Sequence, residues 1–556
     1  MTQNAELPVF LAVAIGYWIG QFKFKGVGLG PVTGSLLAGL LIGNFFHVPV
    51  AETAKSFLFL LFMFGIGYSA GPGFIRGIRD GGWRWIVLAF VIPLTGLFTA
   101  VVMAKILHLE MGYAAGMLSG AMTESPIIGT ASEAIQALPI SADEKHRLIS
   151  QIPVADALTY IFGTLGVIFF CSYIGPWMLR LDLRAEALRL EQEMGIEREK
   201  VGVTSAWRQH ELRAYRINPD SPWHGQTVAQ VEGTQGTLRV FVERVRRGDQ
   251  ILEAEPHLVL QAHDVVAVHA PRRALIEHRQ AQGLEVSDRE LLDIDSATFK
   301  VELTNRALAG KTLSQIASDA QAVHGVFLKN IQRGQEQIPI APGTVLQRGD
   351  WLTIHGLEPA VQRVSKLVGV VAHANHQTNF VVLGLAIFIG AFSGIVLTFP
   401  VGGLHIAVGS SVATLIAGLL IGWRNSVQPM FGQIPAAALE FMKSMGLAAF
   451  VAMIGLKAGP VFIVALQQVG LTVFLGGMAV TLVPQLVGLV VGRYLLGLNP
   501  LLLLGALAGA QTMTAGLAAL QERSESPVAV IGYSSVVAFG HILLSIMGTA
   551  LIWILH

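Results

Sequence analysis

A single cysteine, Cys171, occurs among the 556 residues of this sequence. One thiol cannot form an internal disulfide and cannot supply a thiolate metal cluster. Charged residues are scarce as well, at 13%, and the formal net charge is only +1. This balance lacks the basic excess that is typical of nucleic-acid-binding proteins, so we expect no nucleic-acid partner.

Motifs for nucleotide hydrolysis and metal chemistry are also missing. No Walker or zinc-protease pattern occurs, so we expect neither ATP-driven transport nor an enzyme. His263, His269 and His355 do not have the spacing of zinc ligands, and ordinary buried or exposed histidines are the simpler interpretation. The sequence therefore predicts no catalytic residues, no metal site and no cofactor.

The sequence is rich in apolar side chains and glycine. Hydrophobic residues make up 53% of the chain, and 61 residues are glycine. Small residues let transmembrane helices approach closely, so this composition indicates a polytopic α-helical membrane protein in contact with a lipid bilayer. Of the 75 charged residues, 49 lie between Arg180 and Lys366. We therefore predict two membrane blocks, residues 1–179 and 373–556, on either side of a charged block, residues 180–372.

Each membrane block contains five apolar stretches of roughly the 20 residues needed to cross a bilayer, and one more that polar residues interrupt. The predicted spans are 7–22, 31–46, 54–71, 84–107 and 153–179 in the first block, and 377–399, 405–423, 437–457, 467–492 and 527–553 in the second. The interrupted stretches are 112–137 and 499–520.

The second block repeats the first. The offsets between matching motifs are 379, 388 and 389 residues, in order along the chain, which indicates a duplication. Because five crossings per block is an odd number, the second copy should run through the membrane in the opposite sense. An inverted repeat brings its two interrupted stretches together near the middle of the bilayer, the geometry of alternating access. The matches are LLAGLLIG (36–43) with LIAGLLIG (415–422), GYSAGP (67–72) with GLKAGP (455–460), and GAMT (120–123) with GAQT (509–512).

Basic residues near the span ends predict the orientation. Lys23 and Lys25 follow the first span, and Arg180 and Arg184 follow the last span of the first block. Cytoplasmic loops carry an excess of Lys and Arg, so both termini should lie outside and residues 180–372 inside, at a bacterial cytoplasmic (inner) membrane. The rule holds throughout only if 112–137 enters and leaves on one side, so we expect a re-entrant hairpin there.

The two interrupted stretches are the expected substrate site. Hydroxyls, amides and freed backbone N–H groups suit a small zwitterion or a dicarboxylate, and broken helices are tolerated where they line a wet cavity. The alternative is that the hydroxyls cap helices or bond the preceding turn. Glu124 could relay a proton, bind an ammonium group or hold a cation, or it could lie in water at the mouth of the hairpin. The candidate residues are Thr123, Glu124, Ser125 and Pro126 in the first stretch and Gln511, Thr512 and Thr514 in the second.

Four charged residues near these stretches are weaker candidates. Arg76 and Lys457 lie beside or within the repeated G-P motifs and would hold an anionic substrate, Arg76 with a bidentate fork. The alternatives are a cytoplasmic charge that sets topology for Arg76 and a side chain snorkelling from a helix end for Lys457. Asp156 and Glu133 lie nearer the predicted membrane surfaces, where a structural role is the simpler interpretation.

The charged block begins with a helical linker, residues 180–204, and is itself duplicated as 205–290 and 291–372. GQTVAQ (225–230) matches GKTLSQ (310–315), and AHDVVAVH (262–269) matches RGDWLTIH (348–355). Both copies alternate as strands do around a short helix, and they resemble the TrkA-C (RCK C-terminal) domains of potassium-uptake regulators. No G-x-G-x-x-G fingerprint precedes them. The resemblance implies a small regulatory ligand, for which Arg247 and Arg333 are candidate contacts or ordinary hairpin charges.

The whole chain, with its repeated AGLLIG and AGP motifs around a tandem TrkA-C pair, resembles the aspartate–alanine exchanger family of bacterial antiporters. That resemblance implies a homodimer that exchanges amino acids or dicarboxylates across the membrane. Two other classes stay open. A potassium channel regulated by RCK-like domains would need a filter of the TVGYG type, which is missing. A membrane-anchored ligand sensor would have no use for two interrupted stretches.

Overall fold

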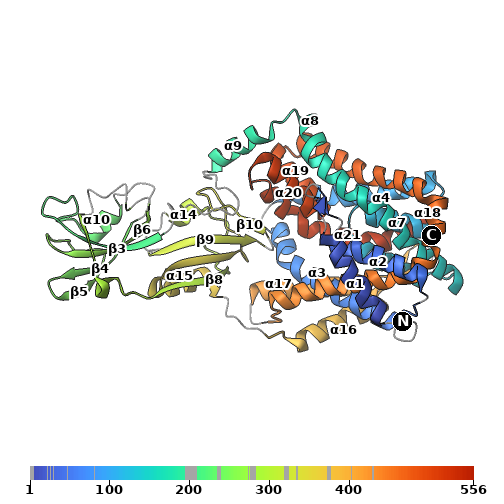
Figure 1. Ribbon diagram of the computed structural model, residues 1–556, viewed down its shortest axis with the longest axis horizontal. Helices are drawn as coiled ribbons and strands as arrows, with labels where there is room; N and C mark the ends of the chain where they lie inside the picture. The colour runs from blue at the N-terminus through green and yellow to red at the C-terminus, as the bar shows by residue number, and fades with distance from the viewer. Residues whose placement is uncertain are drawn as a thin grey trace. The chain divides into compact units, whose positions relative to one another are not determined.

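The structure is a computed structural model that forms two compact units (Figure 1). A membrane unit contains residues 1–190, 333–338 and 374–556, and a second unit contains 191–332 and 339–373. The residues that the structure describes are 6–21, 23–24, 27–28, 30–46, 48–79, 82–194, 210–233, 240–272, 275, 283–317, 325–333, 336–371, 377–401, 404–428 and 431–556.

The first half of the membrane unit is helical apart from one short hairpin. The interrupted stretch 112–137 forms two short helices, α5 (Met111–Ala121) and α6 (Pro126–Ala137). The strands β1 (Lys23–Phe24) and β2 (Val27–Gly28) form the hairpin. The long helices are α1 (Glu6–Gln21), α2 (Gly30–Phe45), α3 (Glu52–Arg79), α4 (Trp83–Ile106) and α7 (Ala142–Phe169), which continues through a π-helical turn (Phe170–Ile174) into α8 (Gly175–Leu179).

The second half follows the same order. A hairpin of β13 (Thr398–Val401) and β14 (Leu404–Ala407) again separates the first two helices, and the stretch 499–520 again forms two short helices. The helices are α16 (Phe380–Val396), α17 (Ser410–Val427), α18 (Ala436–Val490) with a π-helical turn (Val491–Leu495), α19 (Pro500–Ala510), α20 (Thr514–Ser524) and α21 (Val530–Leu555).

The predicted spans 437–457 and 467–492 lie in one continuous helix. Residues 458–466 stay helical, and α18 runs unbroken for 55 residues. At about 1.5 Å per residue such a helix far exceeds the roughly 30 Å of a bilayer core, so it holds the length of two crossings. Pro460 lies inside this stretch and Pro484 further along, but neither ends the helix. In the first half, by contrast, α4 starts only after Gly82.

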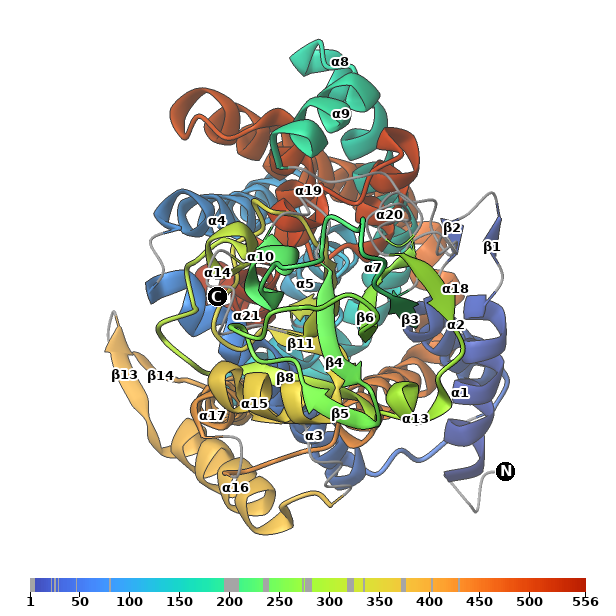
Figure 2. The same cartoon turned by 90° about the vertical axis from the view of Figure 1, so that its left-hand side faces the viewer.

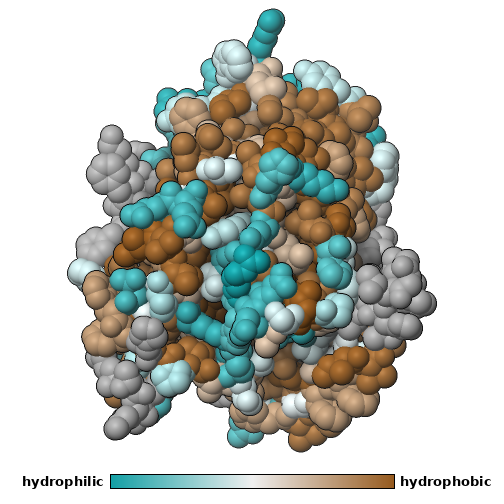
Figure 3. Space-filling model, turned by 90° about the vertical axis from the view of Figure 1, so that its right-hand side faces the viewer, coloured by the Kyte–Doolittle hydropathy of each residue, from teal (hydrophilic) through white to brown (hydrophobic). Residues whose placement is uncertain are grey.

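The length and hydropathy of the helices agree with a membrane location. Five of the described helical segments are long and apolar enough to cross a membrane, and four further apolar helices, α1, α2, α16 and α19, have 10–17 residues. Large apolar side chains point outward from this unit, for example Phe98, Phe388 and Leu471 at 69%, 64% and 74% exposure. Figure 3 shows hydrophilic residues gathered in the middle of one face, with hydrophobic surface around them. An apolar surface of this extent suits contact with lipid.

The repeated motifs pack against each other crosswise. A Cβ at Gly43 of α2 would overlap the carbonyl oxygen of Leu456 in α18, so the two backbones touch. At the equivalent positions, a Cβ at Gly422 of α17 would overlap the carbonyl oxygen of Tyr68 in α3. Glycine permits this approach, as it does in other membrane helix pairs. In each of these two contacts, one helix comes from the first half and the other from the second half.

Contacts along these helices give their directions. Gly39 and Gly43 lie against Ala452 and Leu456, so α2 and the first part of α18 are parallel. Along α3 the order reverses, because Phe59 stacks on Phe450 while Gly65 lies against Lys443. Since α17 is parallel to α3 through its contacts at Phe64 and Tyr68, α2 and α17 run in opposite directions. Their first residues therefore lie at opposite ends of the membrane unit.

The chain also forms two five-stranded sheets of the same strand order, which lie in the second unit apart from β10 and the last residue of β9. Figure 2 labels several of their strands, among them β3, β4, β8 and β11. The first sheet has the order β5-β4-β6-β3-β7 and the second β10-β9-β11-β8-β12. The elements are α9 (Leu183–Met194), β3 (His210–Arg216), α10 (Val228–Gly233), β4 (Phe241–Arg247), β5 (Gln250–Glu253), β6 (Val265–Pro271), β7 (Leu284–Val286), α13 (Arg289–Leu292), β8 (Ser296–Leu303), α14 (Leu313–Ala317), β9 (Val326–Arg333), β10 (Glu336–Ile338), β11 (Trp351–Leu357), α15 (Glu358–Val368) and β12 (Gly369–Val371).

The matching motifs of the second unit are matching helix starts. The Thr227 N–H donates to Gln230 Oε1 at 2.9 Å, and the Gln230 N–H donates back to Thr227 Oγ1. Thr312 and Gln315 make the same reciprocal pair at 2.9 and 3.2 Å. Such capping boxes satisfy N–H groups that a helix start leaves free. The predicted linker helix is present as α9 up to Met194, and the rest of the linker lies outside the described residues.

Candidate functional site

The two interrupted stretches turn at equivalent residues in the same way. Thr123 and Thr512 have φ values of 56° and 55°, in the left-handed region that residues other than glycine rarely adopt. The Glu124 N–H donates to the Ser119 carbonyl at 3.0 Å, and the Met513 N–H donates to the Ala508 carbonyl at 2.9 Å. These bonds close the ends of α5 and α19. Strained residues of this kind cluster at functional sites.

The two short helices of the first interrupted stretch pack along two different long helices. Gly112 and Gly120 of α5 lie against Leu148 and Asp156, so α5 runs parallel to the first part of α7. Beyond the break, the backbone of α6 near Ile127 and Thr130 lies against Gly548, close to the end of α21. The helices α19 and α20 make the same kind of contacts with α7 and α21 exchanged. Helix α19 lies along the start of α21, and α20 lies along the end of α7.

The tips of the two stretches touch each other. Thr512 Oγ1 donates to Glu124 Oε2 at 2.7 Å, and Thr123 Oγ1 donates to the Gln511 carbonyl at 3.3 Å. The structure thus joins four of the predicted site residues. Ser125 and Pro126 are buried at the start of α6, and no side chain caps that start.

Two residues of α21 complete the surroundings of Glu124. Its carboxylate is 2% exposed, Ser545 Oγ donates to Oε1 at 3.4 Å, and His541 Nδ1 lies 3.6 Å from the same oxygen. Sequence reasoning missed both residues. The sequence could have indicated His541, because it is the one histidine in the predicted span 527–553. A titratable side chain inside a membrane helix is a functional candidate in its own right.

Several buried polar atoms near the tips lack a partner within the described part of the chain. Gln511 Oε1 and Gln485 Oε1 are among them, because neither accepts a hydrogen bond. Asp156, at 1% exposure, accepts a hydrogen bond from Ser119 Oγ at 2.6 Å. Buried polar groups are nearly always hydrogen-bonded, so open acceptors at one place fit a site that a polar ligand, an ion or water fills.

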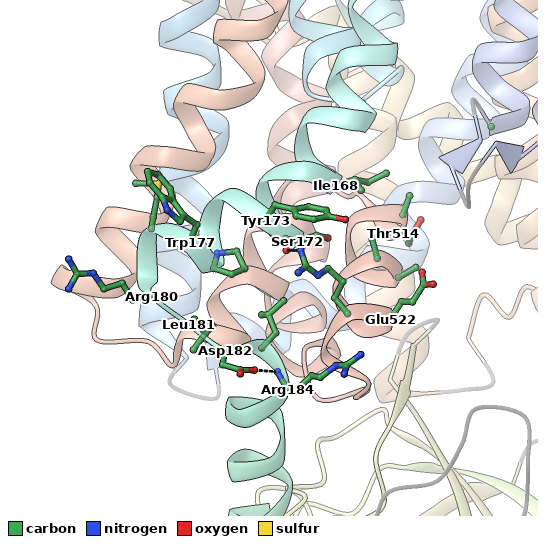
Figure 4. A pocket seen from close by; sticks show the side chains of 18 of the residues that line it. Ile168, Ser172, Tyr173, Trp177, Arg180, Leu181, Asp182, Arg184, Thr514 and Glu522 are labelled. Atoms are coloured by element: carbon green, nitrogen blue, oxygen red, sulfur yellow. Dashed lines mark hydrogen bonds between the residues drawn. The ribbon is translucent and has the colours of Figure 1, made fainter.

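A wide cleft of about 1940 Å³ leads toward the second tip (Figure 4). It lies between the ends of α1, α7 and α20 and the start of α2, and its wall includes Thr514 at the first turn of α20. Arg523 lines it as well, donating to the Ser172 carbonyl at 2.6 Å while its guanidinium lies 4.0 Å from the centre of the Tyr173 ring.

The equivalent place in the other half is closed. A cavity of only about 210 Å³ lies between the ends of α6, α16 and α21 and the start of α17. Because α2 and α17 start at opposite ends of the membrane unit, the cleft and this cavity lie at opposite ends too. Ser125, the counterpart of Thr514, is 6% exposed, whereas Thr514 is exposed. One tip is therefore open to one end of the unit, and the other tip is sealed.

The interrupted stretches and the chain termini can also be assigned to the cleft end or the cavity end of the membrane unit. Since α5 starts beside the start of α7 and α6 ends at the small cavity, 112–137 enters and leaves at the cavity end. This is the hairpin expected from the sequence. Helix α21 ends there too, and α1, antiparallel to α2, begins there. Arg180, after α8, lies at the cleft end.

Comparison with known proteins agrees with this architecture. A family model described as the predicted permease membrane region of aspartate–alanine exchangers matches residues 8–176 and 382–553, and the TrkA-C domain model matches residues 212–281. The chain belongs to this permease family. An uncharacterized transporter of Bradyrhizobium diazoefficiens is 48% identical over 505 residues, which are 91% of this chain and 98% of the relative. Another, of Shewanella oneidensis, is 37% identical over 555 residues, 99% of this chain and 98% of the relative.

One predicted contact of the permease lies elsewhere, and a second is not described. Lys457 Nζ pairs with Glu52 Oε1 at 2.6 Å on the surface of the α3–α18 contact, and it lines neither the cleft nor the small cavity. The structure therefore does not bring it to the tips. Arg76 lies in α3, and its side chain is outside the described residues.

One short pattern in the permease resembles the nucleophile elbow of hydrolases. GYSAG (67–71) has the G-x-S-x-G spacing, which the search of the sequence for catalytic motifs overlooked. An elbow needs a sharp turn between strand and helix to expose its serine. Here the pattern lies inside α3, and Ser69 Oγ donates to the Gly65 carbonyl at 3.0 Å. It is a helix-packing motif, as expected of a transporter.

In the second unit, the candidate residue Arg247 binds a carboxylate of its own sheet. Arg247 makes a two-pronged contact with Asp264 at 3.0 and 2.7 Å. The ring of His269 lies 6.4 Å from that of His355, and burial together with the charge of Lys329 lowers the pKa of His355. Among the described residues, no group of three or more His, Cys, Asp and Glu side chains could hold a metal ion.

Proposed function

We propose that this permease is a secondary exchanger of amino acids or dicarboxylates, and that the substrate binds where the two hairpin tips meet. The observation that carries the proposal is the contact of Thr512 with Glu124, beside the Gln511 side chain, whose Oε1 is buried without a hydrogen-bond partner. Paired broken segments in two halves are where substrates bind in transporters built from inverted repeats.

The chemistry of the tips favours a zwitterion such as aspartate or alanine. Both α6 and α20 begin at the tips, so the partial positive charge of two helix starts converges on this place. That charge suits a substrate carboxylate. The Glu124 carboxylate suits the substrate ammonium group, and the Gln511 amide and the threonine hydroxyls offer neutral hydrogen bonds.

The unequal cavities support alternating access. The cleft opens one tip to one end of the unit while the small cavity leaves the other tip sealed. An inverted repeat can exchange these two conformations between its halves, which exposes one site first to one side and then to the other. In this state the open side is the one where Arg180, Arg184 and Arg523 lie.

The same basic residues support the proposed orientation. Cytoplasmic ends carry the excess of Arg and Lys, so the cleft faces the cytoplasm, residues 180–372 are cytoplasmic and both termini are outside, at the bacterial inner membrane. We further propose that the chain acts as a homodimer and that a small ligand on the tandem TrkA-C domains modulates exchange. Family membership supports both statements.

Counterflow tests the exchange directly. The purified chain is placed in liposomes preloaded with aspartate, glutamate, succinate or alanine, and uptake of the labelled counter-substrate is measured. We expect uptake with at least one internal amino acid or dicarboxylate and none in empty liposomes. Uptake that is equal in loaded and empty liposomes would contradict an exchanger, and potassium flux without amino-acid uptake would favour a channel.

A further inference from the structure

The closed end of the permease is held by one carboxylate. Glu133, in the second half of α6, lies against the first turn of α17, where it accepts from the backbone N–H groups of Ser410 at 2.5 Å and Ser411 at 3.2 Å. Both serine hydroxyls donate to the same carboxylate. Four donors thus converge on Glu133, at the wall of the small cavity. A helix start is a favourable place for a negative charge, because its N–H groups have no partner inside the helix.

The open end has the same carboxylate without the same donors. Glu522 is the counterpart of Glu133 by the 389-residue offset, and it lines the cleft (Figure 4). The counterparts of Ser410 and Ser411 by the 379-residue offset are Pro31 and Val32. Proline has no N–H and valine has no hydroxyl, so only one of the four donors remains.

We propose that Glu133 is the latch of the outward gate: its bonds to the start of α17 keep this end closed, and the half that contains Glu522 cannot make an equally strong closure. Charge-assisted hydrogen bonds are about twice as strong as neutral ones. The difference biases the permease toward the state with the cleft open. This inference rests on the proposed alternating access and adds the residues that set its resting state.

Thiol labelling of the full chain tests the latch. In a Cys171→Ala background, Ala134→Cys places a reporter in the small cavity, where Ala134 is 5% exposed, and Ala518→Cys places one in the cleft. Labelling rates are measured in lipid nanodiscs, where both ends are accessible. We expect Glu133→Gln to raise the rate at Ala134→Cys on the order of tenfold, the effect of losing about one charge-assisted bond. Glu522→Gln is the matched control and should leave that rate unchanged.

A second variant distinguishes opening of the gate from a direct effect of the lost charge on thiol reactivity. Ser410→Ala with Ser411→Ala removes two donors but keeps the charge of Glu133 beside the reporter, so a change in thiol reactivity alone cannot explain a faster rate. It also replaces Glu133→Gln if that protein fails to fold. Wild-type rates in both variants, with normal thermal stability, would overturn the latch, and counterflow by the wild-type protein in that case would leave the exchanger standing. Faster labelling without any counterflow would support the latch and contradict the exchanger.

Discussion

Thr512 Oγ1 donates a hydrogen bond to Glu124 Oε2 at 2.7 Å, across 388 residues of sequence. The reverse contact runs from Thr123 Oγ1 to the Gln511 carbonyl at 3.3 Å. Each hairpin therefore contacts the tip of the other, and both threonines adopt the same left-handed backbone conformation. The two halves thus meet at two residues with left-handed backbone conformation, which are also among the residues that we assign to the substrate.

Removing either threonine hydroxyl should weaken substrate binding modestly. One neutral hydrogen bond contributes about 0.5–1.5 kcal/mol, or roughly two- to tenfold in affinity. We expect this loss in Thr123→Ala and in Thr512→Ala, and a larger loss in the double variant that is not the sum, because the residues share one site. Binding is measured by substrate-induced stabilisation of the purified protein. Thr99→Ala, which removes a buried hydroxyl bonded within α4, is the control and should bind as the wild type does.

The crosswise glycine contacts should tolerate no side chain. Gly43→Ala would place a methyl group against the Leu456 carbonyl, and forced overpacking typically costs about 1–3 kcal/mol. Gly384→Ala is the matched control, because nothing lies within 4 Å of a Cβ there and alanine favours the helix. We expect a lower melting temperature for Gly43→Ala only. Equal melting temperatures would mean that the α2–α18 contact is looser than the structure shows.

The motifs that repeat in the sequence were enough to predict the paired tips, because a duplication leaves residues such as Thr123 and Thr512 in register. The continuity of α18 was not predictable in the same way, since hydropathy marks apolar length but not whether 458–466 bends or breaks. Ser545 and the contact of Glu133 with Ser410 and Ser411 were missed for another reason. They are long-range partners, and one sequence without an observed fold gives no distance between α6, α17 and α21.

Acid should destabilise the second unit through Asp288. Hydrogen bonds from Arg246 hold the pKa of Asp288 below its usual value of 3.8. A carboxyl group with a lowered pKa in the folded state stabilises that state above its unfolded pKa and loses this contribution as the pH falls through the folded value. For a fragment spanning residues 205–368, which we expect to fold alone, Asp288→Asn should therefore lower stability at neutral pH and flatten its acid dependence below about pH 4. Circular dichroism measures both, with Asp249→Asn, on an exposed turn, as the control.

The orientation can be tested in intact cells. In a Cys171→Ala background, we expect an impermeant thiol reagent to label Gln3→Cys from outside and to label Gln250→Cys only after the cells are opened. The reason is the basic end of the membrane unit around Arg180 and Arg184, which should face the cytoplasm. Labelling of Gln250→Cys in intact cells would reverse the assigned sides, although the two ends of the unit would still differ as the structure shows.

Counterflow by Glu124→Gln tests the central claim most directly, because Glu124 is the one buried carboxylate that joins the two tips. The substitution keeps the size of the side chain and removes its charge. If Glu124 holds the substrate ammonium group, a proton or a cation, exchange in liposomes should collapse or lose its dependence on pH, while Glu522→Gln, at the cleft wall, should retain it. Wild-type exchange by a well-folded Glu124→Gln, with an unchanged pH profile, would contradict a substrate site between the tips.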